Sequence, residues 1–166
     1  MDEEMDLHDA AESGDVAMLR TLVAQGADVE AVDAGGRRPL NLAAVMGRVE
    51  ALKTLVELGA DIEAENAGGK RPLLWAAIYG QVEALKTLAE LGADVEAADD
   101  DDGWRALHWA AMEGHVEAVK TLVELQADIE AEDARGTRPL HMAAVPGACG
   151  GVAGAGGAGG GRRGSD

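Results

Sequence analysis

The chain has 166 residues, and its 31 acidic against 14 basic side chains give it a formal net charge of −17. A surface this acidic repels phosphate backbones and anionic lipids, so we expect neither a nucleic-acid partner nor a membrane partner. No run of eighteen apolar residues could span a bilayer, and the acidic N-terminus differs from the basic start of a targeting peptide.

The sequence repeats itself at a nearly constant spacing. A Gly-Ala-Asp motif (Gln-Ala-Asp in its last copy) recurs in steps of 33, 33 and 34 residues, beginning at Gly26, Gly59, Gly92 and Gln126. An Ala-Ala pair recurs in step, ending at Ala11, Ala44, Ala77, Ala111 and Ala144. The extra residue of the third interval falls in the acidic run 99–102. Such a period predicts stacked supersecondary units that share one elongated interior.

Each unit contains the signals for two short helices. In the second unit, Pro39 suits the first turn of a helix over 39–46, and Gly47 ends that helix. A second helix from near Val49 carries apolar residues at positions i, i+3, i+6 and i+7, and Gly59 ends it. The polar residues 60–69 predict an extended finger with a tight turn at 67–69.

The last unit is incomplete. It lacks a second helix, and ten glycines lie among the 21 residues of 146–166. This composition predicts a disordered tail. We therefore expect residues 133–145 to fray, or the chain to be a fragment or the product of a truncated gene.

Two segments carry a family resemblance. Residues 102–115 read Asp-Gly-Trp-Arg-Ala-Leu-His-Trp-Ala-Ala-Met-Glu-Gly-His, and 135–144 read Arg-Gly-Thr-Arg-Pro-Leu-His-Met-Ala-Ala. Together with the Gly-Ala-Asp column, they resemble the ankyrin repeat over residues 5–145. The resemblance implies an all-α solenoid of stacked helix–turn–helix repeats with short β-hairpin or loop fingers. Its repeats would be a degenerate 5–32, the full 33–65, 66–98 and 99–132, and the half repeat 133–145.

The resemblance also implies a function. We expect a monomeric, non-enzymatic module or scaffold that presents a rigid concave surface to a protein partner. The alternative is a non-catalytic fragment of a larger ankyrin-repeat protein whose activity lies in domains outside this chain.

Arginine stands where the family usually has threonine before the first helix. The replacements are Arg38, Arg71, Arg105 and Arg138. Arginine cannot accept the helix-capping bond, so we expect a loss of up to about 1 kcal/mol per repeat. With Arg37 and Lys70, these side chains could form a basic track for an acidic peptide. They could instead pair with the glutamates that recur in step at Glu30, Glu63, Glu96 and Glu130. The shared period favours pairing.

No set of residues predicts catalysis, a cofactor or a bound metal. The four histidines occupy repeat-encoded positions, which favours structural hydrogen bonds. The single Cys149 excludes an internal disulfide and a cysteine metal cluster, and no base lies beside it. This cysteine usage favours an intracellular protein of the cytoplasm or nucleus. The run 99–102 lacks the alternating spacing of a calcium loop, so we interpret it as a solvated finger tip.

The candidate binding residues lie where the repeats differ. In proteins that resemble this one, partners touch the finger tips and the inner surface of the first helix. The finger column is Arg37, Lys70, Trp104 and Thr137, and the helix-end column is Val45, Met46, Ile78, Tyr79, Met112 and Glu113. We expect Met46, Ile78, Tyr79, Met112 and Trp104 to form one exposed apolar strip. Trp75 and Trp109 are expected in the core between repeats.

Overall fold

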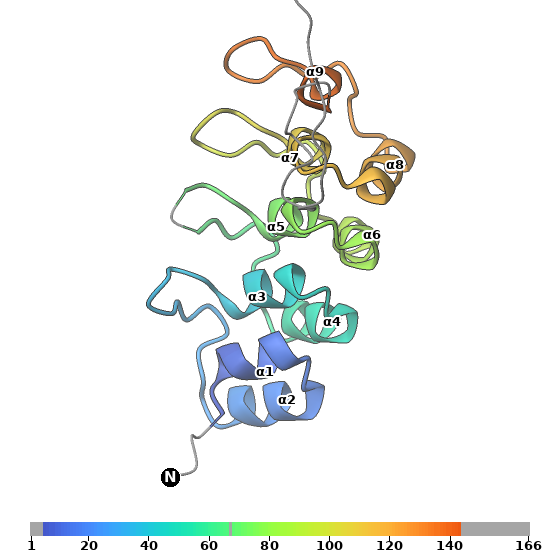
Figure 1. The fold of residues 1–166 in the computed structure, drawn as a ribbon. Coiled ribbons are helices and arrows are strands. Elements are labelled where there is room, and N and C mark those ends of the chain that lie inside the picture. The colour runs from blue at the N-terminus through green and yellow to red at the C-terminus, as the bar shows by residue number, and fades with distance from the viewer. Residues whose placement is uncertain (1–4, 67, 144–166) are drawn as a thin grey trace, which may run out of the picture.

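Two columns of short helices build the protein. The structure is a computed structural model that describes residues 5–66 and 68–143. In these ranges the helices are α1 (Leu7–Ser13), α2 (Val16–Ala24), α3 (Pro39–Val45), α4 (Val49–Glu57), α5 (Pro72–Ile78), α6 (Val82–Glu90), α7 (Ala106–Met112), α8 (Val116–Glu124) and α9 (Pro139–Ala143). Odd-numbered helices stack in one column and even-numbered helices in the other, while the fingers project to one side (Figure 1). The predicted all-α solenoid is confirmed.

Local signals set the helix boundaries as the sequence predicts. Pro39 and Pro72 occupy the first turn of α3 and α5, where a missing N–H costs nothing. Gly47 follows α3 with a φ of 67°, a left-handed conformation that an L side chain rarely adopts. α9 is the last helix among the described residues. The predicted tail 146–166 and the end of the predicted fraying segment lie outside the described residues.

Alanine and leucine form the shared interior. The Ala-Ala pairs of α1, α3, α5 and α7 are buried, for example Ala43, Ala44, Ala76 and Ala77, each at 0% exposure. Their small side chains let each first helix pack directly on the equivalent helix of the next repeat. The leucines of the second helices fill the space between the columns, and Leu88 is also fully buried. The core is therefore continuous along the stack.

A carboxylate or amide side chain organises each finger. The backbone amide of Asp33 donates to the carbonyl of Arg37 over 3.0 Å, and Asp33 Oδ1 accepts the amide of Arg37 over 2.9 Å. Asn66, Asp99 and Asp133 repeat this arrangement. Asp99 is 5% exposed, so the solvated tip predicted for 99–102 is wrong for its first residue. A single β-bridge, Ala98–Arg105, occurs in the described ranges, so the fingers are loops rather than regular hairpins.

The repeating glutamates join neighbouring repeats. Glu63 pairs with Arg71 over 2.9 Å, and its other oxygen accepts the backbone amide of Asp94 in the next repeat over 2.7 Å. Glu30 and Glu96 make the same two contacts. Arg37 and Lys70 pair with finger aspartates. The structure thus shows the internal pairing that the shared period favoured.

The glutamate contacts form one ladder of bonds between repeats, and a second ladder runs along the other side of the stack. The residue before α4, α6 and α8 donates to a carbonyl in the last turn of the preceding repeat's first helix. Arg48 Nε reaches Glu12 O over 3.0 Å, Gln81 Nε2 reaches Val45 O over 2.8 Å, and His115 Nε2 reaches Ile78 O over 2.8 Å. His108 Nε2 contacts Thr137 O over 3.1 Å and His8 Nε2 contacts Ala31 O over 2.9 Å, so three of the four histidines make the structural hydrogen bonds that their positions predicted. The side chain of His141 is exposed and makes no such bond with the described residues.

Candidate protein-interaction surface

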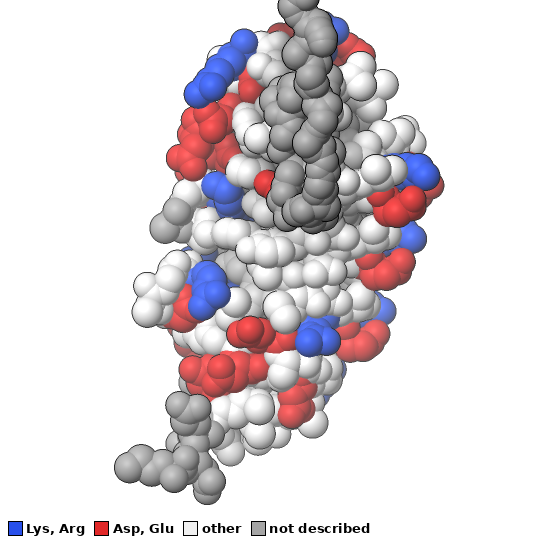
Figure 2. Space-filling view, in the orientation of Figure 1, with Lys and Arg blue, Asp and Glu red and all other residues white. Residues whose placement is uncertain are grey.

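The surface over the first helices differs from the two edges of the molecule. Charged side chains gather along the finger edge and along the second helices, and at the level of α3 and α5 the surface between them is formed mostly by uncharged residues (Figure 2). This surface is hollowed by a pocket of about 140 Å³. The pocket is lined by Arg37, Asn41, Leu42, Val45, Trp75 and Tyr79.

An aromatic pair forms one wall of this pocket. The rings of Trp75 and Tyr79 stack with centroids 6.4 Å apart and planes inclined by 30°. Tyr79 is 52% exposed, whereas Trp75 is half-buried and packs against the core. A rigid aromatic with one face in the core and one face in a hollow offers contact area at little entropic cost.

Two N–H groups beside the pocket have no acceptor among the described residues. They are Asn41 Nδ2 and Trp75 Nε1, both buried. In each case, a residue that completes the equivalent hydrogen bond in a later repeat is replaced by asparagine. Asn41 stands where His108 stands two repeats later, and the shorter amide makes no bond corresponding to that from His108 to Thr137 O.

The indole of Trp75 lacks its acceptor for a similar reason. Trp109 Nε1, on the first helix of the same repeat, donates to the finger residue Asp99 Oδ2 over 3.0 Å. The equivalent finger residue of the preceding repeat is Asn66, whose one side-chain oxygen already accepts the amide of Lys70 over 3.1 Å. Buried donors of this kind cost free energy until an acceptor reaches them.

The structure brings together only part of the predicted site. Arg37, Val45 and Tyr79 line the pocket, and Met46, 40% exposed, follows Val45 at the end of α3. Glu113 lies at the equivalent helix end two repeats further along the stack, half-buried. These positions support the helix-end column as a surface, with its hollow in the second and third repeats.

The expectation of one exposed apolar strip is wrong. Ile78, Met112 and Trp104 are half-buried. Trp104 Nε1 donates to Asp133 Oδ2 over 3.0 Å, and its ring packs edge-on against Trp109 with centroids 4.7 Å apart. The next finger therefore holds Trp104 in place.

The remaining finger residues are also engaged. Lys70 Nζ lies 5.3 Å from the centre of the Trp109 ring and 3.5 Å from Asp101. Thr137 is half-buried, and its backbone groups bond to Asp133 and His108. Arg37 is tied to Asp33 at 2.8 Å but keeps about half of its side chain exposed. Arg37 is thus the finger cation with the greatest access to the pocket.

Sequence reasoning missed Asn41, Leu42 and Trp75 as pocket residues. The sequence could have identified Asn41, since it stands at a position that is histidine in three of the five units. Trp75 was assigned to the core, and the structure shows it both against the core and at the pocket.

Hydrogen bonding fixes the charge of two finger aspartates. The amide of Arg37 lowers the pKa of Asp33 despite the opposing effect of burial, and the Arg37 guanidinium and the Gly35 amide lower it further. Burial alone would raise the pKa of Asp133, but the amides of Thr137 and Arg135 and the Trp104 indole outweigh it and lower that pKa. Both groups are therefore ionised at neutral pH.

The stacked helix pairs and projecting fingers define a helical repeat protein. The chain belongs to the ankyrin repeat family, since residues 7–99 and 91–152 match ankyrin repeats (three copies). Ankyrin repeats generally act as protein-interaction modules, and the family is typically non-catalytic. A comparison with curated proteins gave no match. No helix in residues 5–66 and 68–143 is long and apolar enough to cross a membrane, and these residues contain no group of histidine, cysteine and acidic side chains that could hold a metal ion.

Proposed function

We propose that this protein is a non-enzymatic, monomeric scaffold that binds a protein partner on the surface of its first helices, in the cytoplasm or nucleus. The partner contacts the helix-end and finger columns, with the pocket between α3 and α5 as its anchor. The net charge of −17 on this protein disfavours nucleic acid as the ligand.

The pocket and its aromatic wall carry the proposal. A peptide that lies across α3 and α5 can place an apolar side chain against Trp75 and Tyr79. Asn41 Nδ2 and Trp75 Nε1 are buried beside this pocket and have no acceptor among the described residues. A carbonyl oxygen of the peptide can accept from them only after the neighbouring side chains shift, and each such bond would then remove the desolvation cost of one buried donor. Because the pocket is preformed on stacked helices, little entropy is lost on binding.

The test is a binding measurement with the full chain. A partner captured by the immobilised protein is purified, and its affinity is compared between the wild type and Tyr79→Ala. Truncation of an aromatic anchor should weaken the complex by about 1–4 kcal/mol. Because Tyr79 is half-exposed, the melting temperature should barely change. Glu90→Gln on α6, at an exposed position outside both pockets, is the control and should leave the affinity unchanged. Equal affinity for wild type and Tyr79→Ala would reject the proposed surface.

A further inference from the structure

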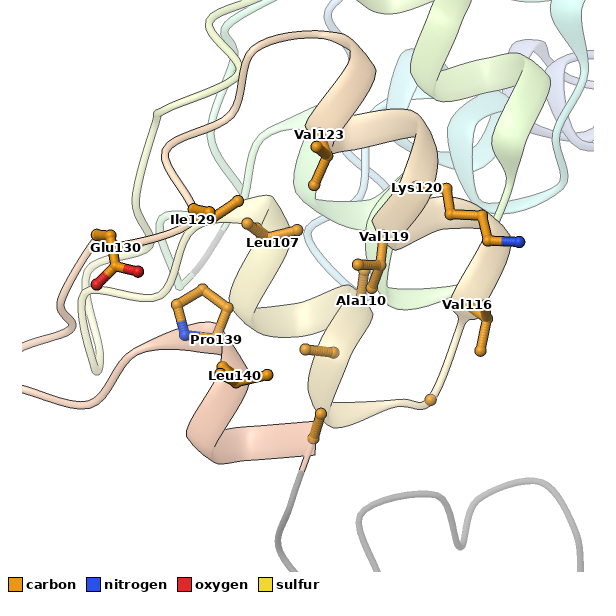
Figure 3. Close-up of a pocket in the computed structure, with 13 residues that line it drawn as sticks. Leu107, Ala110, Val116, Val119, Lys120, Val123, Ile129, Glu130, Pro139 and Leu140 are labelled. Atoms are coloured by element: carbon orange, nitrogen blue, oxygen red, sulfur yellow. The ribbon is translucent and has the colours of Figure 1, made fainter.

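A second, larger hollow lies at the C-terminal end of the described helices, away from the pocket between α3 and α5. It has a volume of about 530 Å³ and is formed by α7, α8, α9 and the finger residues Ile129 and Glu130. Its lining is almost entirely aliphatic, and Leu107, Val119, Val123, Ile129 and Leu140 face across it (Figure 3).

Comparison with the earlier repeats shows that the residues around this hollow lack the helix that covers their equivalents. Leu40, Leu73 and Leu107 occupy one column and are 2%, 3% and 4% exposed, whereas Leu140 in the same column is 77% exposed. In the second helices, Val116 is 62% exposed, while its equivalents Val49 and Val82 are half-buried. α2, α4 and α6 each contact the next second helix, and no described helix packs against α8 in that way.

Both polar ladders stop at the same place. Glu30, Glu63 and Glu96 each accept a backbone amide from the turn after the next second helix. Glu130 pairs with Arg138, but no described residue supplies the amide. The carbonyls of Glu12, Val45 and Ile78 accept a side chain that precedes the next second helix. Met112 holds that position at the end of α7, and no described residue donates to it.

The apolar groove and these two ladder positions specify one occupant. We infer that the groove beside α8 and α9 binds a single amphipathic α-helix from another protein, seated as α8 is seated on α6. Such a helix has nine residues, about 14 Å, with apolar side chains at i, i+3, i+6 and i+7. An arginine, glutamine or histidine before it reaches Met112 O, and a turn amide after it reaches Glu130.

The chain itself does not carry this pattern in the required register. One repeat after the stripe of α8, the sequence has Cys149, Val152, Ala155 and Gly156, and Ala148 stands at the position of the donor. Glycine disfavours a helix by about 1 kcal/mol per residue, and no leucine or isoleucine occurs in 144–166.

A second copy of the chain fits the groove poorly. The second helices of each copy are engaged in its own stack. Two chains of net charge −17 also repel each other. Residues 116–143 carry six acidic and three basic side chains, so neutral or basic side chains on the outer flank of the incoming helix are favoured.

The probe for the test is a peptide with the sequence of residues 47–61. It contains the donor Arg48, the apolar stripe of α4 and the turn that ends at Asp61. A lactam between Lys53 and Glu57, which are only partly covered in the solenoid, holds it helical. The peptide carries a fluorophore, and its binding to the full-length protein is followed by anisotropy.

We expect saturable binding to the wild type. Four protein variants show whether the peptide occupies the groove. Val123→Glu places a charge in the groove and should weaken binding at least tenfold, and Glu130→Gln should weaken it severalfold. Val32→Glu, at a valine 58% exposed on a finger outside the groove, and Tyr79→Ala should leave it unchanged. A peptide that ends at residue 58 lacks the turn amide, so it should bind wild type and Glu130→Gln equally.

Three results would overturn the inference: no saturable binding to the wild type, binding that Val123→Glu leaves intact, or a wild-type dimer in sedimentation that Val123→Glu dissociates. The last would make a second copy the occupant. This site is independent of the proposed function, because loss of peptide binding with retained Tyr79-dependent partner binding rejects the groove alone.

Discussion

The glutamate ladder makes a quantitative prediction about coupling between repeats. Glu63→Ala removes an ion pair with Arg71 and a charge-assisted bond to the amide of Asp94. The Glu63 and Arg71 side chains are 31% and 27% exposed. A hydrogen bond to a charged group contributes about 1.5–3 kcal/mol, and a partly screened ion pair about 0.5 kcal/mol. Arg71 keeps Glu65 as a partner at 3.0 Å, so the expected loss is about 2 kcal/mol.

The matched control is Glu130→Ala in the same column. Its side chain is 63% exposed and pairs with Arg138, with no amide from the described residues, so only the ion pair is lost. We expect a loss of about 0.5 kcal/mol. Urea unfolding of both variants measures the difference, with equal m-values required for the comparison. A Glu63→Ala variant that loses no more stability than Glu130→Ala would refute the role of the amide bond between repeats.

Two further predictions concern the turns and the fingers. Gln126 has a φ of 69° where Gly26, Gly59 and Gly92 occupy the other repeats, so Gln126→Gly should stabilise the protein by about 0.5 kcal/mol in urea unfolding, and a loss of stability would contradict this. The lowered pKa of Asp33 stabilises the fold above the ordinary value of 3.8, and this contribution is lost as pH falls through the folded pKa. Asp33→Asn, which keeps an acceptor oxygen as Asn66 does, should therefore lose stability relative to wild type at pH 7 and converge with it as pH falls below the folded pKa of Asp33; a constant difference would exclude the linkage.

The helices were predictable because their signals are local. The proline before α3, the glycine after it and the apolar stripe of α4 each act within a few residues. The ion pairs between arginine and glutamate were also predictable, since the residues equivalent to Arg38 and to Glu30 recur with the same period.

The exposure and the contacts of individual surface residues could not be predicted from the spacing of the repeats. Trp104 is held by Asp133, 29 residues away, and the sequence alone does not show toward which neighbour a finger side chain turns. The two donors without acceptors beside the pocket likewise arise because Asn41 and Asn66 do not make the bonds that His108 and Asp99 make in another repeat. A repeat period predicts which positions are equivalent, but it does not predict which contacts each side chain makes.

The most direct test of the proposed function is a hydrogen-exchange footprint of the full chain with and without its purified partner. Binding at the pocket should slow exchange in α3, α5 and the finger that carries Arg37, which together surround Tyr79. Exchange in the outer turns of α4 and α6 should stay unchanged. Protection confined to those second helices, with α3 and α5 unaffected, would contradict binding on the surface of the first helices.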